Sequence, residues 1–235
     1  MKTSIIKIFV LFAFLFTCTY TGTAAETIAV ILKVKGQVYI VKNNSDKASA
    51  AKPKRGYRLE NGDKLVTGKK SYAAVRFIDD ASQVRVRSNS TCYIRGEKKN
   101  NEVLKNVYLE VGTILARVTQ QKGKFEVSTP TSVASVKGTE WIVDQKFEGG
   151  TFYYGLEGVV ELSNDAGSAL LHEGETGYVA SKDTPPIISK TKEGEVPGFD
   201  DEGDDMDFFQ FEFENDGGQK KMLEFKSSGL TEEEE

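Results

Sequence analysis

The stretch Phe125–Val143 reads FEVSTPTSVASVKGTEWIV, and it decides the fold class of this chain. Its apolar residues alternate with polar ones, which is the pattern of β-strands that bury one face. Pro130 interrupts the first run, because proline has no N–H to give to a strand ladder. The apolar positions change from even numbers at Val136 to odd numbers at Trp141. Since Gly138 lies at this change, and a lone glycine in a strand pattern is typical of a bulge, we predict a β-bulge there.

This stretch resembles the FecR domain family of bacterial envelope proteins. The run Val136-Lys137-Gly138-Thr139 matches the family's signature, Asn61–Phe77 resembles its first hairpin region, and Leu156–Val160 resembles its closing strand. The resemblance spans about residues 29 to 180 and implies an all-β envelope module that works by recognition. The residues that carry the signature are Gly62, Asp63, Gly68, Pro130, Val136, Lys137, Gly138, Thr139 and Gly158.

The chain departs from the family pattern directly after Phe77. Where the family has an Asp-Gly-Ser turn, residues 78–82 read IDDAS, with no glycine and one additional residue. A two-residue turn that needs a glycine at positive φ is therefore expected to be built differently here.

Alternating apolar positions recur along most of the chain, and no long apolar stripe at helical spacing occurs before residue 190. The even-numbered apolar residues of Ile28–Val34 are predicted to share one strand face, and those of Phe152–Leu162 another. We therefore predict an all-β fold, either a compact β-sandwich or a short solenoid-like domain. The sequence does not choose between these two architectures.

The N-terminus has the pattern of a secretion signal. Lys2 and Lys7 precede an apolar run at Ile8–Phe16, and Thr23-Ala24-Ala25 fits a cleavage site. The run is shorter than the ~20 apolar residues of a membrane span, although an uncleaved anchor is the alternative. Cys18 loosely fits a lipoprotein box, which would attach the chain to a membrane by lipidation. We expect export to the periplasm or the cell surface.

Charge divides the rest of the chain into two parts. Residues 26–191 carry 25 Lys and Arg against 19 Asp and Glu, a net charge of +6, whereas residues 192–235 carry 4 against 16, a net charge of −12. We predict a signal peptide at 1–25, a FecR-like all-β domain at 26–185 and an acidic tail at 186–235. The composition of the tail favours disorder when it is free.

A strip of arginines is the first candidate for partner binding. Arg85 and Arg87 are two residues apart in one predicted strand and should point together, and Arg76 is expected to extend the strip. The partner would be acidic: the chain's own tail, an anionic glycan or surface polymer, or another envelope protein. The alternative is an ordinary charged solvent face.

The tail supplies the second candidate. Phe209, Phe211 and Phe213 alternate with polar residues, so an extended conformation would place them on one face. Such a strand is able to add to an exposed sheet edge, on this molecule or on a partner.

The sequence predicts no catalytic residue, metal site or cofactor. His172 is the only histidine and lies in a turn pattern, and no cysteine and histidine spacing fits a zinc site. Cys92 is expected to be a buried small hydrophobe, with a reactive thiol or an intermolecular bridge as the alternative. Nucleic acid is not an expected partner, because the chain is predicted to be exported and is net negative.

These features favour a non-catalytic, exported binding or scaffolding module that acts by protein or glycan contact. Because only a leader precedes the β domain, we do not expect the cytoplasmic sigma-regulator arm of the best-known FecR relatives. Two alternatives stay open: a surface protein that self-assembles by edge pairing of its aromatic tail, and an envelope hydrolase that uses His172.

Overall fold

The computed structural model describes residues 26–43, 50–99, 102–118, 123–136, 138–199, 209–214 and 220–225. Every helix or strand assigned in these ranges is a β-strand, so the predicted all-β class is confirmed. Within them, no helix is long and apolar enough to cross a membrane. Lys137, one of the predicted signature residues, lies outside the described residues.

Seventeen of the described strands form two layers, sheet A and sheet B, which share strand β9 (Glu102–Arg117). Sheet A has the order β4-β1-β6-β7-β9-β12-β13-β16-β17 and is antiparallel throughout. Its strands besides β9 are β1 (Thr27–Lys35), β4 (Arg58–Glu60), β6 (Tyr72–Phe77), β7 (Gln83–Val86), β12 (Glu140–Gln145), β13 (Thr151–Glu157), β16 (Glu175–Val179) and β17 (Ile187–Lys190).

Sheet B has the order β3-β2-β5-β8-β9-β10-β11-β14-β15. Its pairs are antiparallel except for β9 and β10, which run parallel. Its strands besides β9 are β2 (Val38–Val41), β3 (Ala50–Ala51), β5 (Asp63–Thr67), β8 (Thr91–Lys99), β10 (Phe125–Ser128), β11 (Val133–Val136), β14 (Val159–Asn164) and β15 (Gly167–His172).

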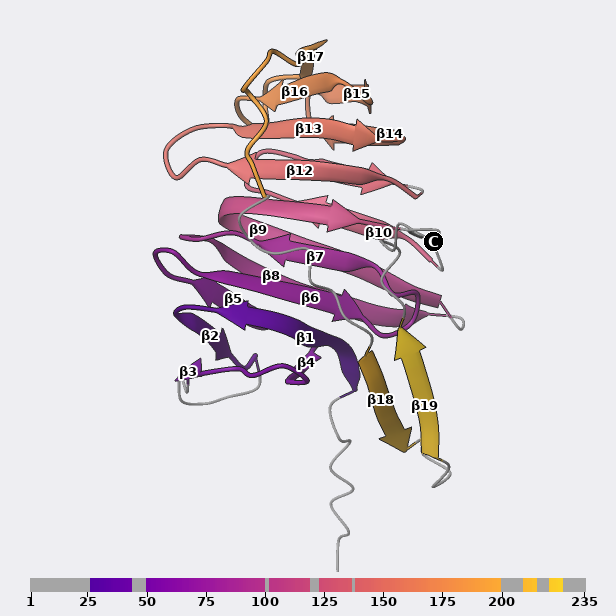
Figure 1. Cartoon of the computed structure of the whole chain (residues 1–235). Coiled ribbons are helices and arrows are strands. Elements are labelled where there is room, and N and C mark those ends of the chain that lie inside the picture. Colours follow the sequence, from indigo (N-terminus) through magenta and orange to yellow (C-terminus); the bar gives the residue numbers. More distant parts are fainter. Residues whose placement is uncertain are drawn as a thin grey trace, which may run out of the picture.

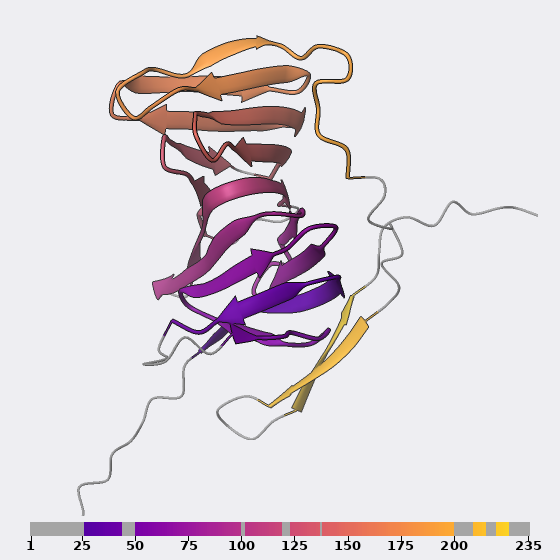
Figure 2. The same ribbon diagram turned by 90° about the vertical axis from the view of Figure 1, so that its left-hand side faces the viewer.

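The two predicted architectures are both present in this arrangement. The sheets face one another as in a sandwich, while the chain passes repeatedly from one sheet to the other, as in a short solenoid. Figure 1 shows the strands stacked nearly in chain order, from β1 at the indigo end to β17 at the orange end. Figure 2 shows the same progression from the side.

Side chains from the inner faces of the two sheets fill the core between them. In this core the ring of Phe125 lies edge-on to those of Phe77 and Trp141, at centroid distances of 5.6 and 5.9 Å. All three side chains are fully buried. Each contributes roughly 1.5–3 kcal/mol through burial, and edge-to-face packing adds to this.

The predicted bulge at Gly138 is wrong. Strand β11 ends at Val136 in sheet B and β12 begins at Glu140 in sheet A, so Gly138 lies where the chain crosses between the sheets. The parity of the buried positions changes because the two sheets present opposite faces of the strand to the core. Gly138 has a φ of +75°, and Gly158, at the crossing from β13 to β14, has a φ of +77°. Glycine adopts this left-handed conformation without the penalty of a Cβ.

Both predicted strand faces are also wrong. In β1, Val30 and Leu32 pack on the outer face while Ile31 lies in the core. The register shifts between Ile31 and Lys33, and after this shift Val34 packs against the core. The odd-numbered Tyr153 of β13 enters the core, and its even-numbered neighbours lie on the outer face of sheet A. The even-numbered residues of β14 are buried because the chain has crossed into sheet B between the two strands.

The turn after Phe77 is built without glycine, as expected from its sequence. Ala81 takes up a φ of +62°, and a carboxylate oxygen of Asp80 accepts a hydrogen bond from the Ser82 N–H at 3.0 Å. The turn also brings Asp79 and Asp80 to the buried ammonium group of Lys105.

The C-terminal region contributes to two separate structures. Strand β17 begins at Ile187, beyond the predicted end of the β domain at residue 185, and pairs with β16. Strands β18 (Phe209–Glu214) and β19 (Lys220–Phe225) form an antiparallel hairpin that is a sheet of its own. Figures 1 and 2 both show this hairpin outside the two-sheet body, near its β1 end.

Candidate functional site

The outer face of sheet A carries a row of large side chains across its strands. Cross-strand register places Arg85 of β7 beside Leu115 of β9, Leu115 beside Ile142 of β12, and Ile142 beside Tyr154 of β13. Residues directly opposite one another in antiparallel strands contact through their side chains. The row therefore forms an apolar floor with a cation at one end.

The segment that follows β17 covers this floor. The backbone N–H of Thr191 donates to the carbonyl of Gly174 at 3.0 Å, and the hydroxyl groups of Thr176 and Thr191 are 2.9 Å apart. A carboxylate oxygen of Glu195 accepts a hydrogen bond from the Lys192 N–H at 2.9 Å. These contacts fasten the start of the segment and direct it back over the sheet.

The segment ends on the floor with Phe199. This ring is 9% exposed and forms one cluster with Leu115, Ile142 and Tyr154. The guanidinium carbon of Arg87 lies 5.3 Å from its centroid. A guanidinium group at this distance from an aromatic face is a cation–π contact, worth roughly 0.5–1 kcal/mol at a partly exposed site.

A groove of about 520 Å³ adjoins Phe199. Two arginines line it: Arg85, and Arg117, which makes a two-pronged ion pair with Glu140 through hydrogen bonds of 2.9 and 3.0 Å. Glu140 thus neutralises Arg117, and the groove offers the Arg85 guanidinium beside an apolar surface, which suits an aromatic side chain next to a carboxylate. Glu140 itself also lines the groove, and the remaining lining residues are Leu115, Ile142, Leu156, Val196, Pro197, Gly198 and Phe199.

Two titratable groups near this floor have displaced pKa values. Burial lowers the pKa of the Arg76 guanidinium, which still leaves it charged at neutral pH. Burial, followed by the nearby carboxylates of Asp144 and Glu195, raises the pKa of Tyr154 to about 12. The phenol of Tyr154 is therefore neutral beneath Phe199.

The predicted arginine strip lies on this same face of sheet A. Arg76 opposes Gln83 across β6 and β7, and Arg85 follows two residues later on β7. Arg87 comes directly after β7, and its N–H donates to the carbonyl of Thr113. All three arginines are partly exposed.

The structure separates the other predicted binding residues from this face. Phe209, Phe211 and Phe213 lie in β18 of the separate hairpin. Sequence reasoning missed Phe199 and its floor altogether. Two features of the sequence could have indicated them. One is the single aromatic residue in the polar run before Asp200, and the other is the even-numbered apolar residues of β13.

The predicted family-signature residues stabilise the two-sheet body and do not line the groove beside Phe199. Val136 and Thr139 are buried on either side of the Gly138 crossing, and Pro130 lies in the turn between β10 and β11. A Cβ on Gly158 would stand 2.6 Å from a Thr139 methyl carbon. Gly62 turns β4 into β5 with a φ of +85°, Asp63 is buried and accepts the Glu60 N–H at 2.9 Å, and Gly68 follows β5.

The described residues show no arrangement that performs catalysis in an obvious way. His172 is exposed, and its backbone N–H donates to Glu175 at 2.8 Å. No group of three or more His, Cys, Asp or Glu side chains in the described ranges is placed to hold a metal ion. Cys92 is buried with a free thiol, and burial raises its pKa to about 12.

Comparison with known proteins finds similarity in the two-sheet body. Residues 63–161 match the family model described as FecR protein. The chain contains a FecR domain. The matched residues include Gly138 and Gly158, where the chain crosses between the two sheets, and they do not include Phe199. No curated protein matches this FecR-domain chain.

Two solved structures resemble the FecR-domain chain. Both are crystal structures of a provisionally assigned anti-sigma factor from Parabacteroides distasonis, at 2.50 and 1.65 Å resolution. They share 15% and 16% sequence identity with this chain, with TM-scores of 0.48 and 0.47. Each alignment covers 55% of this chain and 60% of the other, so this chain spans about 60% of the length of those proteins.

Proposed function

We propose that this chain is an exported, non-catalytic FecR-domain protein that binds a partner polypeptide on the outer face of sheet A. The docking of Phe199 carries the proposal. It demonstrates how an aromatic residue is accommodated there, between Arg87 and the floor of Leu115, Ile142 and Tyr154. Export is supported by the signal-like pattern of residues 1–25.

The chemistry of the floor defines the kind of partner. An aromatic ring removes apolar surface from water when it contacts Leu115 and Ile142, and Arg87 contacts its face. Carboxylates next to that ring would meet Arg85 and the arginine side of the groove. The partner segment is therefore extended, with an aromatic residue followed by acidic ones, as in Phe199-Asp200-Asp201 of this chain.

The Phe199 segment would then act as an internal ligand. Because it is part of the same chain, its effective concentration at the floor is high, and an external segment has to displace it. Partner binding is expected to be weak until Phe199 leaves, which makes the segment a built-in competitor.

A peptide-binding experiment with the full chain tests this proposal. The probe is a fluorescent peptide with the sequence of residues 195–203, EVPGFDDEG. Phe199→Ala should open the floor and bind the probe about tenfold more tightly than the unaltered chain, because the internal competitor is lost. Adding Ile142→Ser to Phe199→Ala should abolish binding, and adding Arg87→Ala should weaken it roughly two- to fivefold.

Arg55→Ala in the Phe199→Ala background is the matched control, because Arg55 is an exposed arginine outside the groove. It should leave probe binding unchanged. Equal binding by the unaltered chain and Phe199→Ala, or binding that survives Ile142→Ser, contradicts the site. Fractionation of expressing cells tests export separately, since an unprocessed chain retained in the cytosol contradicts that part alone.

A further inference from the structure

The two-sheet body has two ends, and each end exposes one edge strand of each sheet. Strands β3 and β4 are the edges at one end, whereas β15 and β17 are the edges at the other (Figure 1). Among the described strands, each of these four pairs with a single neighbour. The backbone N–H and C=O groups along an edge are able to pair with a further strand, so both ends offer a route to extend the sheets.

Strand β15 is the least protected of these edges. Natural edge strands are commonly protected by short length, by charged side chains or by proline. Strands β3 and β4 are two and three residues long, and β17 contains Lys190. Strand β15 has six residues, GSALLH, without Lys, Arg, Asp, Glu or Pro, and its Leu170 is 55% exposed. This edge therefore favours pairing with another strand.

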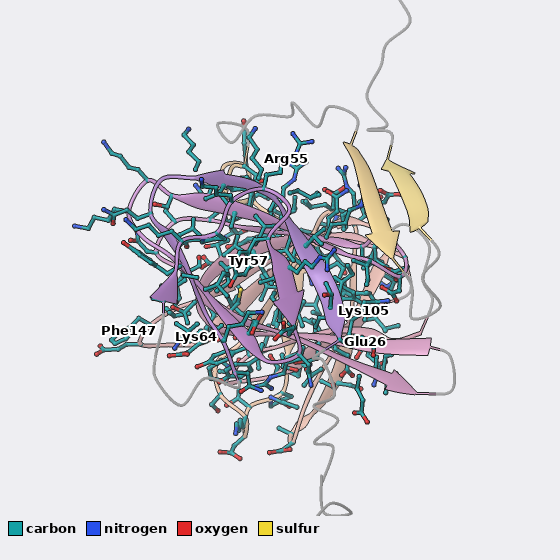
Figure 3. All side chains as sticks on the ribbon, turned by 90° about the horizontal axis from the view of Figure 1, so that it is seen from below. Glu26, Arg55, Tyr57, Lys64, Lys105 and Phe147 are labelled. Atoms are coloured by element: carbon teal, nitrogen blue, oxygen red, sulfur yellow. The ribbon has the colours of Figure 1, made fainter. Side chains whose placement is uncertain are left out.

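A basic strap, which we define as residues 52–58, crosses the other end of the body from β3 into β4. Its sequence is KPKRGYR, and its four exposed cationic residues are Lys52, Lys54, Arg55 and Arg58. The strap is fixed to β1, because the Gly56 N–H donates to the Ile31 carbonyl at 2.8 Å and the Ile31 N–H donates to the Tyr57 carbonyl at 2.9 Å. Figure 3 views the molecule from this end and labels Arg55. The backbone thus holds the cations on the end surface.

The β15 end is acidic. Asp165 and Glu173 lie in the turns on the two sides of β15, Asp183 lies between β16 and β17, and all three are exposed. Residues 157–191 contain six Asp and Glu against two Lys and Arg, a net charge of −4, whereas residues 26–62 contain three against eight, a net charge of +5. Because the strands stack nearly in chain order, the opposite charges lie at opposite ends of the body (Figure 1).

We propose that the β15 end of one copy of this chain docks on the basic strap of a second copy, so that sheet B continues from β15 into β3. The same arrangement brings β17 toward β4, the edges of sheet A. A body with opposite charges at its two ends attracts another copy head to tail and repels it head to head. Edge pairing then supplies the directional contacts.

This contact uses different surfaces on the two copies and is therefore heterologous. Each added copy leaves one basic end and one acidic end available, so that the assembly either grows as an open chain or closes as a ring. The strap and β15 do not line the groove beside Phe199, so this proposal and the proposed partner site are tested independently.

Light scattering on size-exclusion fractions of the full chain tests the proposal. The unaltered chain should assemble at about 0.01 M salt, where charges interact over roughly 30 Å, and should dissociate at about 1 M, where they interact over roughly 3 Å. Lys52→Glu combined with Lys54→Glu should elute as a monomer at both salt concentrations. Asp165→Lys combined with Glu173→Lys should do the same.

Lys69→Glu combined with Lys70→Glu is the matched control. These two exposed lysines lie in the turn between β5 and β6, outside the strap, and their reversal changes the net charge by the same amount. The control should still assemble. Thermal unfolding shows whether each variant folds, and Lys52→Gln combined with Lys54→Gln repeats the basic arm if the reversed variant does not.

Mixing the two charge-reversed variants gives the decisive result. Each retains one original end, so an equimolar mixture should assemble again, and so should a single chain that carries all four substitutions, because its end charges are exchanged. Amide hydrogens of β15 should exchange more slowly in the assembly than in either monomeric variant. An unaltered chain that stays monomeric at low salt, as it would if its own acidic residues 192–235 covered the strap, overturns the proposal. A mixture of monomers only, or unchanged exchange in β15, also overturns it.

Discussion

The ammonium nitrogen of Lys105 lies 2.6 Å from a carboxylate oxygen of Asp80, and both side chains are completely buried. A second carboxylate, that of Asp79, lies 2.6 Å from the same nitrogen and is 17% exposed. These contacts join β9 to the turn after Phe77. Desolvation raises the pKa of Asp79, although Lys105 opposes that effect.

Replacing Lys105 should therefore be costly. Lys105→Met leaves two carboxylates without their cation in a buried site, and we expect the free energy of unfolding to fall by about 3–5 kcal/mol. Urea denaturation measures this. Lys124→Met, which breaks the exposed pair with Glu126, is the control and should cost under about 1 kcal/mol. Equal losses in the two variants would show that burial of the ion pair does not matter.

Gly158 and Gly174 should respond differently to replacement by alanine. Gly158 and Gly174 have nearly equal φ values of +77° and +74°. A Cβ on Gly158 would clash with Thr139, whereas one on Gly174 meets no atom within 4 Å. Gly174→Ala should cost about 1 kcal/mol from backbone strain alone, and Gly158→Ala about 2–4 kcal/mol. Thermal unfolding of both variants checks the difference, and equal shifts would argue against the clash.

A buried hydroxyl network beside the turn at Pro130 supports a third prediction. The phenol of Tyr153 lies 2.8 Å from the Ser132 hydroxyl, and Thr129 and Thr151 continue the network at 2.9 Å. Tyr153→Phe leaves a buried hydroxyl with one partner fewer, so it should destabilise the fold by about 1–2 kcal/mol. Tyr154→Phe is the neighbouring control on the outer face and should change stability by less than about 0.5 kcal/mol.

Sequence alternation identified which strands exist, and it identified much of the core. Trp141, Val84 and Val86 are buried as their parity indicates. The alternation of apolar residues did not predict the buried faces correctly across Gly138 and Gly158. The chain changes sheet at these glycines, and a local sequence pattern does not distinguish such a crossing from a bulge. In β1, both faces are covered, so a one-sided pattern describes it poorly.

The candidate site was predictable in part. The parity of β7 predicts that Arg85 and Arg87 share one surface, and the structure places Arg85 beside Leu115 and Arg87 beside Phe199; their role in partner binding stays a prediction. The floor of that surface depends on three strands and a returning segment that are distant in sequence. Cross-strand register brings Leu115 to Ile142, and the segment that follows β17 brings Phe199 to both.

The buried thiol of Cys92 makes the free energy of unfolding depend on pH in the alkaline range. Its pKa rises from an ordinary value of 9.0 to about 12 in the fold because burial disfavours the thiolate. The fold therefore keeps the full benefit of the neutral thiol below pH 9 and loses it as the pH rises toward 12. Relative to Cys92→Ala, the unaltered chain should lose about 1.4 kcal/mol of unfolding free energy per pH unit in that interval.

Urea denaturation of both chains at pH 7.5, 9 and 10.5 measures that slope. Parallel pH dependence in the two chains would show that Cys92 does not cause it. Native Cys92 should also resist alkylating reagents until denaturant is added, since the thiol is enclosed.

The sharing of β9 between the two sheets has a consequence for cooperativity. Residues before Gly112 pair with β8 and β10, and residues after it pair with β7 and β12. Detaching β9 from either layer would expose the central hydrogen bonds of both. We therefore expect amide hydrogens on the two sides of Gly112 to exchange together, in a single opening event, with neither layer surviving alone.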